Sequence, residues 1–266
     1  MGESRATSWG QGLRLRLGVE GRRVPLDSLD LAALERALLV FAHPDDEINA
    51  AGLVCRLRRA GVQVELLVLT DGAANPWTDE AVVAGRSHLA CRTDELRASM
   101  AILGAEGLTM PALPDSKLRE HLVAAIDVVS QTIARVRPGL VVTFDARGIN
   151  GHPDHMAAHA AVRSALHTSA TAPALAMLLP PPPFSWALGA GFRWRRTPTV
   201  AALTLEGDEL ETKARAFEAH RSQQRTLRLL TAGLPPRTFF RQFPHEWFLW
   251  LTRDEARAWA DDEASR

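Results

Sequence analysis

The chain has 266 residues and a mass of 29.1 kDa, with 46% hydrophobic and 23% charged residues. These values are ordinary for a globular protein and exclude disordered and collagen-like chains. Because 31 basic residues balance 31 acidic ones, the charge predicts neither a nucleic acid nor an anionic membrane surface as a partner.

The first half of the chain alternates short apolar runs with helical patterns. The clearest helix lies between Leu118 and Val136, where apolar residues recur at spacings of three and four. It stops before Pro138, as the restricted backbone before a proline requires. The elements predicted in this half are, in chain order, strand 37–42, helix 45–60, strand 62–70, helix 93–103 and helix 118–136.

The second half continues the alternation. Its predicted elements are strand 140–144, helix 153–167, strands 173–179 and 199–205, and a last long helix that begins at Asp208. Two long loops are expected, over 72–87 and 180–196. Strands that alternate with helices predict an α/β fold whose mostly parallel sheet has helices on both faces. We expect one domain over 1–266, in which 1–30 has no clear assignment.

Few features of the sequence indicate the cellular compartment of the protein. Two cysteines, Cys55 and Cys91, are too few to staple a chain of this length, and we interpret both as small buried thiols. The first twelve residues are polar, and no stretch reaches the roughly 18 apolar residues of a membrane span. We therefore expect a cytoplasmic protein without a membrane span. No pattern indicates an oligomeric state.

Two motifs follow predicted strands. The first, AHPDDE, occupies residues 42–47, and the second, GHPDH, occupies residues 151–155. In a doubly wound sheet, the loops at the carboxyl ends of the strands form the ligand crevice. We therefore expect both motifs to border one pocket, although they are far apart in sequence.

The motifs contain the donors of a catalytic metal site. His43 and Asp46 lie three residues apart where a strand enters a helix, so that both can face one point. With His155 they offer one carboxylate and two imidazoles, which is the ligand type of a catalytic zinc site. We predict one Zn²⁺ per chain, although nitrogen and oxygen donors also suit iron, cobalt or nickel.

Three neighbours of these ligands have expected catalytic roles. Asp45 is a natural general base for a water on the metal. His152 can stabilise an oxyanion or protonate a leaving nitrogen, and Asp154 can hold the His152 imidazole in orientation. The alternative is that the prolines and acids only cap two helices. One such motif would leave that alternative open, but two histidine-bearing motifs after two strands disfavour it.

With these two motifs, the sequence resembles the PIG-L/LmbE family of zinc-dependent N-deacetylases. Members act on N-acetylglucosaminyl-phosphatidylinositol, on mycothiol and bacillithiol precursors, and on sugars of glycopeptide and aminoglycoside antibiotics. Weaker similarities are Thr70-Asp71-Gly72, Arg92 with Glu95 and residues 103–104, residues 113–115, and Lys213 with residues 220–223.

The resemblance implies a Rossmann-like fold with the metal at the strand ends. It implies zinc ligands at His43, Asp46 and His155, and it makes Asp45 the general base. His152 would then assist the tetrahedral intermediate. The implied reaction removes an N-acetyl or other N-acyl group from an amino sugar or glycoconjugate by attack of metal-bound water.

Substrate contacts are less specific. Asp115 can bind sugar hydroxyls or cap a helix, and Arg92 can contact a substrate oxygen or pair with a neighbouring acid. Some sugar deacetylases of the family carry a tyrosine two residues before the equivalent of His152. This chain has no tyrosine, and Asn150 stands at that position. Its amide can donate a hydrogen bond, with a shorter reach.

Three other functions compete. An amidase of the same family acting on a non-sugar or thiol-conjugate amide would carry the same motifs. A nucleotide-binding module without catalysis would need a glycine-rich loop after the first strand, where this chain has His-Pro-Asp-Asp. An inactive relative that only binds ligands would not need all five of the catalytic and metal-binding residues.

Overall fold

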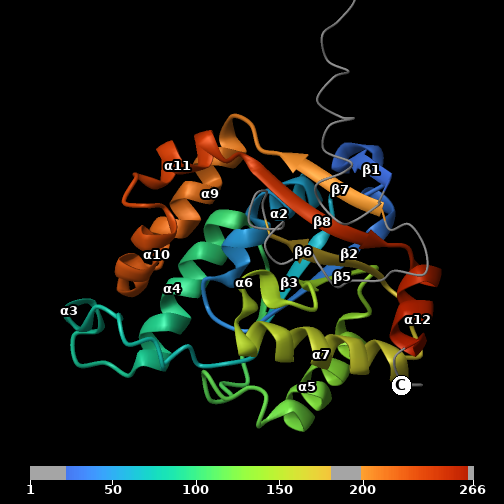
Figure 1. Ribbon diagram of the computed structural model, residues 1–266, viewed down its shortest axis with the longest axis horizontal. Coiled ribbons are helices and arrows are strands. Elements are labelled where there is room, and N and C mark those ends of the chain that lie inside the picture. Colours follow the sequence, from blue (N-terminus) through green and yellow to red (C-terminus); the bar gives the residue numbers. More distant parts are fainter. Residues whose placement is uncertain (1–21, 181–198, 263–266) are drawn as a thin grey trace, which may run out of the picture.

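The computed structural model describes residues 22–180 and 199–262. They contain one eight-stranded sheet of order β1-β7-β8-β6-β5-β2-β3-β4 (Figure 1). The strands are β1 (Arg22–Pro25), β2 (Arg36–Phe41), β3 (Gln63–Val68), β4 (Gly107–Thr109), β5 (Leu140–Phe144), β6 (Ala174–Leu179), β7 (Thr199–Thr204) and β8 (His245–Leu251). Among these, β8 alone is antiparallel, since it pairs antiparallel with β6 and β7 while the other pairs are parallel.

Helices cover both faces of the sheet (Figure 1). On one face, α5 (Leu122–Val136), α7 (Pro153–Thr168) and α12 (Arg253–Asp262) pack against one another and against β2, β5 and β6. The helices of the other face are α2 (Ala51–Arg59), α4 (His88–Leu103), α9 (Asp208–Ala219) and α11 (Pro236–Gln242). Shorter helices are α3 (Glu80–Val83), α6 (Gly148–Gly151) and α10 (Gln224–Leu230). The predicted fold class is confirmed.

The central strands are buried on both sides. Every residue of β5 is buried, and so is every residue of β2 after Arg36. A strand covered on both faces reads as a continuous apolar run rather than as an alternation. This is why the sequence predicts β2 and β5 closely, and β5 at its observed bounds.

Several predicted bounds need correction. The helix expected from residue 45 begins as a 3-10 turn over Asp46–Ala50 and becomes α-helical only at Ala51. Asp208 opens α9, but α10, α11, β8 and α12 follow it, so it does not begin the last helix. Strands β1, β4 and β8 were not expected. The predicted loop over 180–196 lies outside the described residues apart from Pro180, and the prediction of one domain stays a prediction.

No helix within 22–180 or 199–262 is long and apolar enough to span a lipid bilayer. Of the two cysteines, Cys91 is buried and Cys55 half-buried, and neither forms a disulfide.

Cys55 is expected to resist alkylation at neutral pH. Burial, followed by the nearby charges of Glu246 and Glu209, raises the pKa of its thiol to about 11. Since the thiolate is the reactive form, the rate should climb about tenfold per pH unit until pH nears the pKa. Iodoacetamide kinetics on a Cys91→Ser variant would measure this, and a plateau at about pH 9, as for an ordinary thiol, would contradict it.

Candidate metal centre and active site

The two motifs meet at the carboxyl ends of adjacent strands. His43 follows β2, His155 lies in α7 after β5, and β2 pairs directly with β5. The chain leaves β2 toward β3 on one side and later returns to β5 on the other, so this is the switch point where α/β sheets bind ligands. The ring centroids of His43 and His155 are 5.2 Å apart, which is close enough for both to face one ion.

Asp46 stands between these two imidazoles. Its Oδ2 lies 3.4 Å from His43 Nδ1, and its Oδ1 lies 3.2 Å from His155 Nε2. The backbone N–H of His43 also donates to Oδ2, at 2.7 Å. Burial alone would raise the pKa of Asp46, but the charges and hydrogen bonds of His155 and His43 hold it well below its usual range. Asp46 therefore contacts both of the other predicted metal ligands.

Hydrogen-bond partners assign the tautomers of two imidazoles. His155 Nδ1 faces the Gly148 carbonyl at 3.0 Å, and His43 Nε2 faces Asp115 Oδ1 at 3.1 Å and Asp154 Oδ2 at 3.2 Å. A carbonyl or carboxylate oxygen only accepts, so each of these nitrogens carries the hydrogen. The opposite nitrogens, His155 Nε2 and His43 Nδ1, are the two that face Asp46.

His152 has the reverse arrangement. As the N-cap of α7, its Nδ1 accepts a hydrogen bond from the Asp154 backbone N–H at 3.2 Å. Burial, together with the charges of His43 and His155, lowers the pKa of His152, which favours the neutral ring. A neutral ring whose Nδ1 accepts must carry its hydrogen on Nε2. His152 can therefore donate from Nε2 to a bound ligand.

The expected contact of the Asp154 carboxylate with His152 is wrong. The carboxylate is completely buried, and its hydrogen-bond partners are other groups. Its Oδ2 contacts His43 Nε2 and accepts the Ser116 N–H at 2.7 Å, while Oδ1 accepts the Leu118 N–H at 3.0 Å. Asp154 thus orients His43 and anchors the loop before α5.

Asp45 is held in a strained turn beside the predicted ligands. Its φ of 114° lies in a region that residues other than glycine rarely adopt. Arg92 from α4, only 2% exposed, donates to the Pro44 carbonyl and to Asp45 Oδ2, the latter at 3.1 Å. Burial raises the pKa of Asp45, and Arg92 opposes this. Arg92 is thus engaged with the predicted base, and a substrate contact by Arg92 stays a prediction.

Asp115 and Asn150, the other two predicted substrate contacts, differ in their exposure and in their partners. Asp115 Oδ1 contacts His43, and its Oδ2 accepts the Ala74 N–H at 2.8 Å. Burial would raise the pKa of Asp115, but the hydrogen bond and charge of His43 lower it to about 2. Asn150 is exposed, and its Oδ1 accepts the His152 N–H at 3.1 Å. A substrate contact by either residue stays a prediction.

The charge around His43 favours a cation. Burial lowers the pKa of His43, but hydrogen bonds with Asp115, Asp154 and Asp46 outweigh burial and raise it well above its usual value. Two sets of donor atoms lie within 4.8 Å of one another, those of His43, His152 and His155 and those of His43, Asp115 and Asp154. Nitrogen and carboxylate donors at this spacing can hold a divalent metal ion.

A buried pair at the first motif, Glu47 and His220, is not predicted from the sequence. Glu47 and His220 are completely buried and in contact, with His220 Nε2 2.7 Å from Glu47 Oε1. Glu47 belongs to the first motif, but no role is predicted for it from the sequence, and His220 lies within the weaker similarity of residues 220–223. His159, one helical turn after His155, is a core residue whose Nδ1 contacts the Phe144 carbonyl at 2.9 Å.

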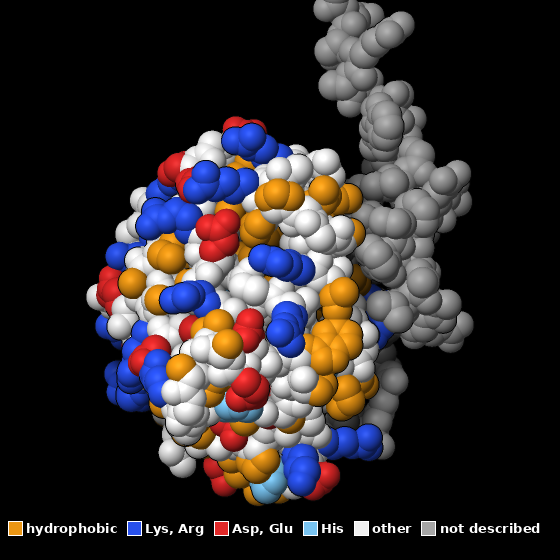
Figure 2. Space-filling view, turned by 90° about the vertical axis from the view of Figure 1, so that its left-hand side faces the viewer, with side chains coloured by type: hydrophobic (Ala, Val, Ile, Leu, Met, Phe, Trp, Pro, Cys, Tyr) orange, Lys and Arg blue, Asp and Glu red, His pale blue; other side chains and the backbone are white. Residues whose placement is uncertain are grey.

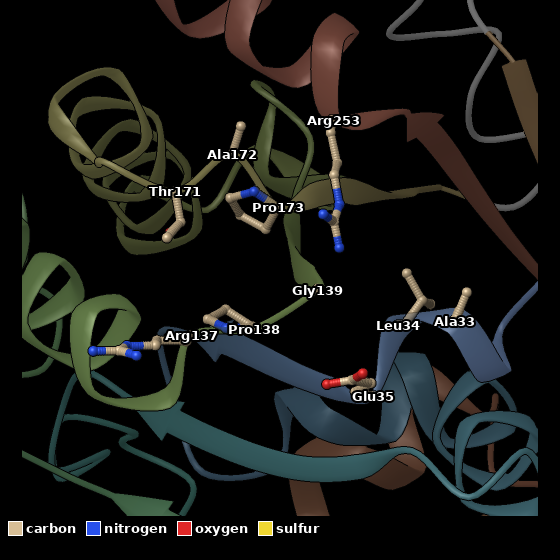
Figure 3. Close-up of a pocket in the computed structure, with 10 residues that line it drawn as sticks. All are labelled: Ala33, Leu34, Glu35, Arg137, Pro138, Gly139, Thr171, Ala172, Pro173 and Arg253. Atoms are coloured by element: carbon tan, nitrogen blue, oxygen red, sulfur yellow. The ribbon is translucent and has the colours of Figure 1, made fainter.

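A hollow at the amino ends of the central strands, opposite the two motifs, has different chemistry. It lies where β2, β5 and β6 begin and has a volume of about 340 Å³ (Figure 3). Its lining includes Arg137, Arg253 and Glu35 but no histidine or cysteine, so it lacks the imidazole donors that gather at the carboxyl ends.

Part of the sheet and both motifs lie in a stretch that matches a known family. Residues 38–166 match the family model "PIG-L: GlcNAc-PI de-N-acetylase". This stretch is a PIG-L domain. Both motifs lie inside the PIG-L domain, whereas Lys213 and His220 lie beyond its matched end.

Relatives of the PIG-L domain carry one recurring name. The chain is 33% identical over 164 residues to a 1D-myo-inositol 2-acetamido-2-deoxy-alpha-D-glucopyranoside deacetylase of Rhodococcus erythropolis (strain PR4 / NBRC 100887), which covers 53% of this chain and 56% of the relative. A protein of the same name from Geodermatophilus obscurus is 34% identical over 162 residues, with 51% and 54% covered. The chain thus spans about half the length of the curated relatives it matches.

Solved structures share the fold beyond the PIG-L domain. A deacetylase triple mutant of the teicoplanin biosynthetic pathway matches with a TM-score of 0.62 and 22% identity, over 81% of this chain and 97% of that one. The N,N'-diacetylchitobiose deacetylase from Pyrococcus horikoshii matches with a TM-score of 0.58 and 19% identity, over 95% of both chains. At these identities the likeness establishes the fold.

Proposed function

We propose that this protein is a zinc-dependent hydrolase that removes an N-acetyl or other N-acyl group from an amino sugar or glycoconjugate. The observation that carries the proposal is the convergence of His43 Nδ1 and His155 Nε2 on Asp46, at the ends of adjacent strands. The names of the relatives, which are amino-sugar deacetylases, support the same reaction.

The proposed ligands fit zinc in donor type, and each imidazole lies at ligand spacing from Asp46. Two ligand atoms at about 2.0–2.1 Å from a tetrahedral ion are about 3.3 Å apart; His155 Nε2 lies 3.2 Å from Asp46 Oδ1, and His43 Nδ1 lies 3.4 Å from Asp46 Oδ2. The outer nitrogen of each imidazole is held by an oxygen acceptor, as in most zinc–histidine sites. When bound, zinc would polarise the amide carbonyl and make a water more acidic.

The side chains around the ligands supply proton transfer. The Asp45 carboxylate, 20% exposed and fixed by Arg92, accepts a proton from the attacking water. His152 donates from Nε2 to the oxygen on which negative charge develops. The proton held by Asp45 then passes to the leaving amine. Asp154 contributes through the metal site, because it fixes the ring of His43, a proposed ligand.

The proposed partner is a small molecule. Lys and Arg side chains are interspersed with Asp and Glu side chains over the face in Figure 2, as expected from the zero net charge. That face therefore has no uniformly basic surface for a nucleic acid. An amidase acting on a non-sugar amide would use the same groups, and the choice of substrate separates the two proposals.

Acetate release is the direct test. The full chain, freed of metal with a chelator and reloaded with one equivalent of zinc, is expected to release acetate from N-acetylglucosaminyl-inositol or N,N'-diacetylchitobiose. Activity only on N-acyl amino acids or thiol-conjugate amides would favour the amidase. No hydrolysis of any of these amides by the zinc-loaded protein would refute the proposed reaction.

A further inference from the structure

Glu47 is a completely buried carboxylate with three partners from three parts of the chain. Its Oε2 accepts the Asp45 N–H at 3.0 Å, and its Oε1 accepts the Ser99 hydroxyl at 2.6 Å and contacts His220 Nε2 at 2.7 Å. A buried charge is costly unless it is paired and hydrogen-bonded. The cluster of Glu47, Ser99 and His220 meets that requirement and bonds directly to the backbone of Asp45.

That bond lies at the strained point of the first motif. A positive φ at a residue other than glycine is strained and persists only where neighbours hold it. The turn at Asp45 directs its carboxylate to Arg92, while the next carboxylate, Asp46, faces His43 and His155. Glu47 therefore bonds to the peptide whose conformation separates the proposed base from the proposed ligand.

His220 is held rigidly by its own segment. It caps the end of α9, and the following turn is fixed by buried Glu95 of α4, which accepts the Ser222 N–H at 2.6 Å and the Ser222 hydroxyl at 2.8 Å. Because the Glu47 carboxylate accepts, His220 Nε2 carries the hydrogen of this contact. Among the described residues, His220 Nδ1 has no hydrogen-bond partner, so the bond to Glu47 is the polar contact of this ring.

We propose that His220, acting through Glu47, is a positioning residue for Asp45. It fixes the Glu47 carboxylate, which in turn holds the Asp45 backbone in the turn that aims the base. The inference rests on the proposed function, and it assigns a role in the site to a residue beyond the matched domain.

The test uses kinetics of the zinc-loaded full chain. Since misplacing a catalytic group by about 1 Å can cost up to about 100-fold in rate, His220→Leu is expected to lower kcat by about 10- to 100-fold. KM should change less than about threefold, as for a loss expressed in the transition state. His220→Gln, whose amide can donate to Glu47, should recover most of the lost kcat. His167→Leu, which removes an imidazole paired with Asp261 far from the motifs, is the matched control.

A second readout does not depend on activity. Exchange of the Asp45 amide hydrogen, followed by NMR, should be slow in the wild type and in His220→Gln and faster in His220→Leu. If the wild type hydrolyses no amide, the proposed function fails, while amide exchange still decides whether His220 holds Asp45.

Ser99→Ala covers the case in which His220→Leu does not fold. It removes the hydroxyl bond to Glu47 and should also lower kcat and speed exchange, whereas Thr132→Ala, which removes a buried hydroxyl bonded to Val128, should change neither. A folded His220→Leu or Ser99→Ala protein with wild-type kcat and wild-type Asp45 exchange would overturn the proposal.

Discussion

Asp45→Asn is expected to lower kcat for amide hydrolysis by about 10²- to 10⁴-fold, the usual contribution of a general base. The substitution removes the basic carboxylate and little else. Asparagine has the same shape, its carbonyl oxygen can accept from Arg92 as Asp45 Oδ2 does, and asparagine tolerates positive φ better than most residues. The proposed zinc ligands remain in place.

Steady-state kinetics together with zinc content would measure this effect. Asp127→Asn, at an exposed position of α5, is the matched control and should keep wild-type kcat. An Asp45→Asn protein that keeps one zinc per chain and a kcat within threefold of the wild type would show that another group takes the proton.

Those parts of the fold that were predicted are the ones where local sequence and tertiary environment agree. β2, β3, β5 and β6 are apolar runs because helices cover both faces of the sheet. β4 has only three half-buried residues and leaves no such run. β8 (HEWFLWL) is apolar enough, but its place between β6 and β7 depends on pairing with strands more than 40 residues away.

The same distinction applies to the site. His43, Asp45 and Asp46 share one short motif, so spacing alone brings them together. The contact between Glu47 and His220 joins residues 173 positions apart, and no local pattern predicts it. The resemblance includes residues 220–223, but it assigns His220 no contact with the first motif.

Asp154 illustrates a limit of reasoning from adjacency. Its nearness in sequence to His152 suggested a carboxylate–imidazole contact, but α7 begins at Pro153. Residues in the first turn of a helix project from different sides of its axis. The carboxylate of Asp154 consequently reaches the loop of Ser116 and Leu118 and the ring of His43, while only its backbone N–H meets His152.

Substitutions of the two histidines of the second motif should have different effects, one on zinc affinity and the other on kcat. His155→Ala removes the nitrogen that faces Asp46. Because loss of a group that merely supports a ligand already costs about 10- to 100-fold in metal affinity, loss of the ligand itself should weaken zinc binding by more than about 100-fold. His152→Ala removes a donor to the oxyanion, so it should keep one zinc per chain and lower kcat by about 10²- to 10³-fold.

Competition with a chelating dye would measure the zinc affinity of each variant, and acetate release would measure kcat. His167→Ala, on the exposed end of α7, should match the wild type in both. Donor distances alone would permit a site of His43, His152 and His155, in which loss of His152 would weaken zinc binding as much as loss of His155. An equal loss of zinc affinity in both variants would therefore indicate that His152, and not Asp46, is the third ligand. His152 Nε2 would then bind the ion in place of its hydrogen.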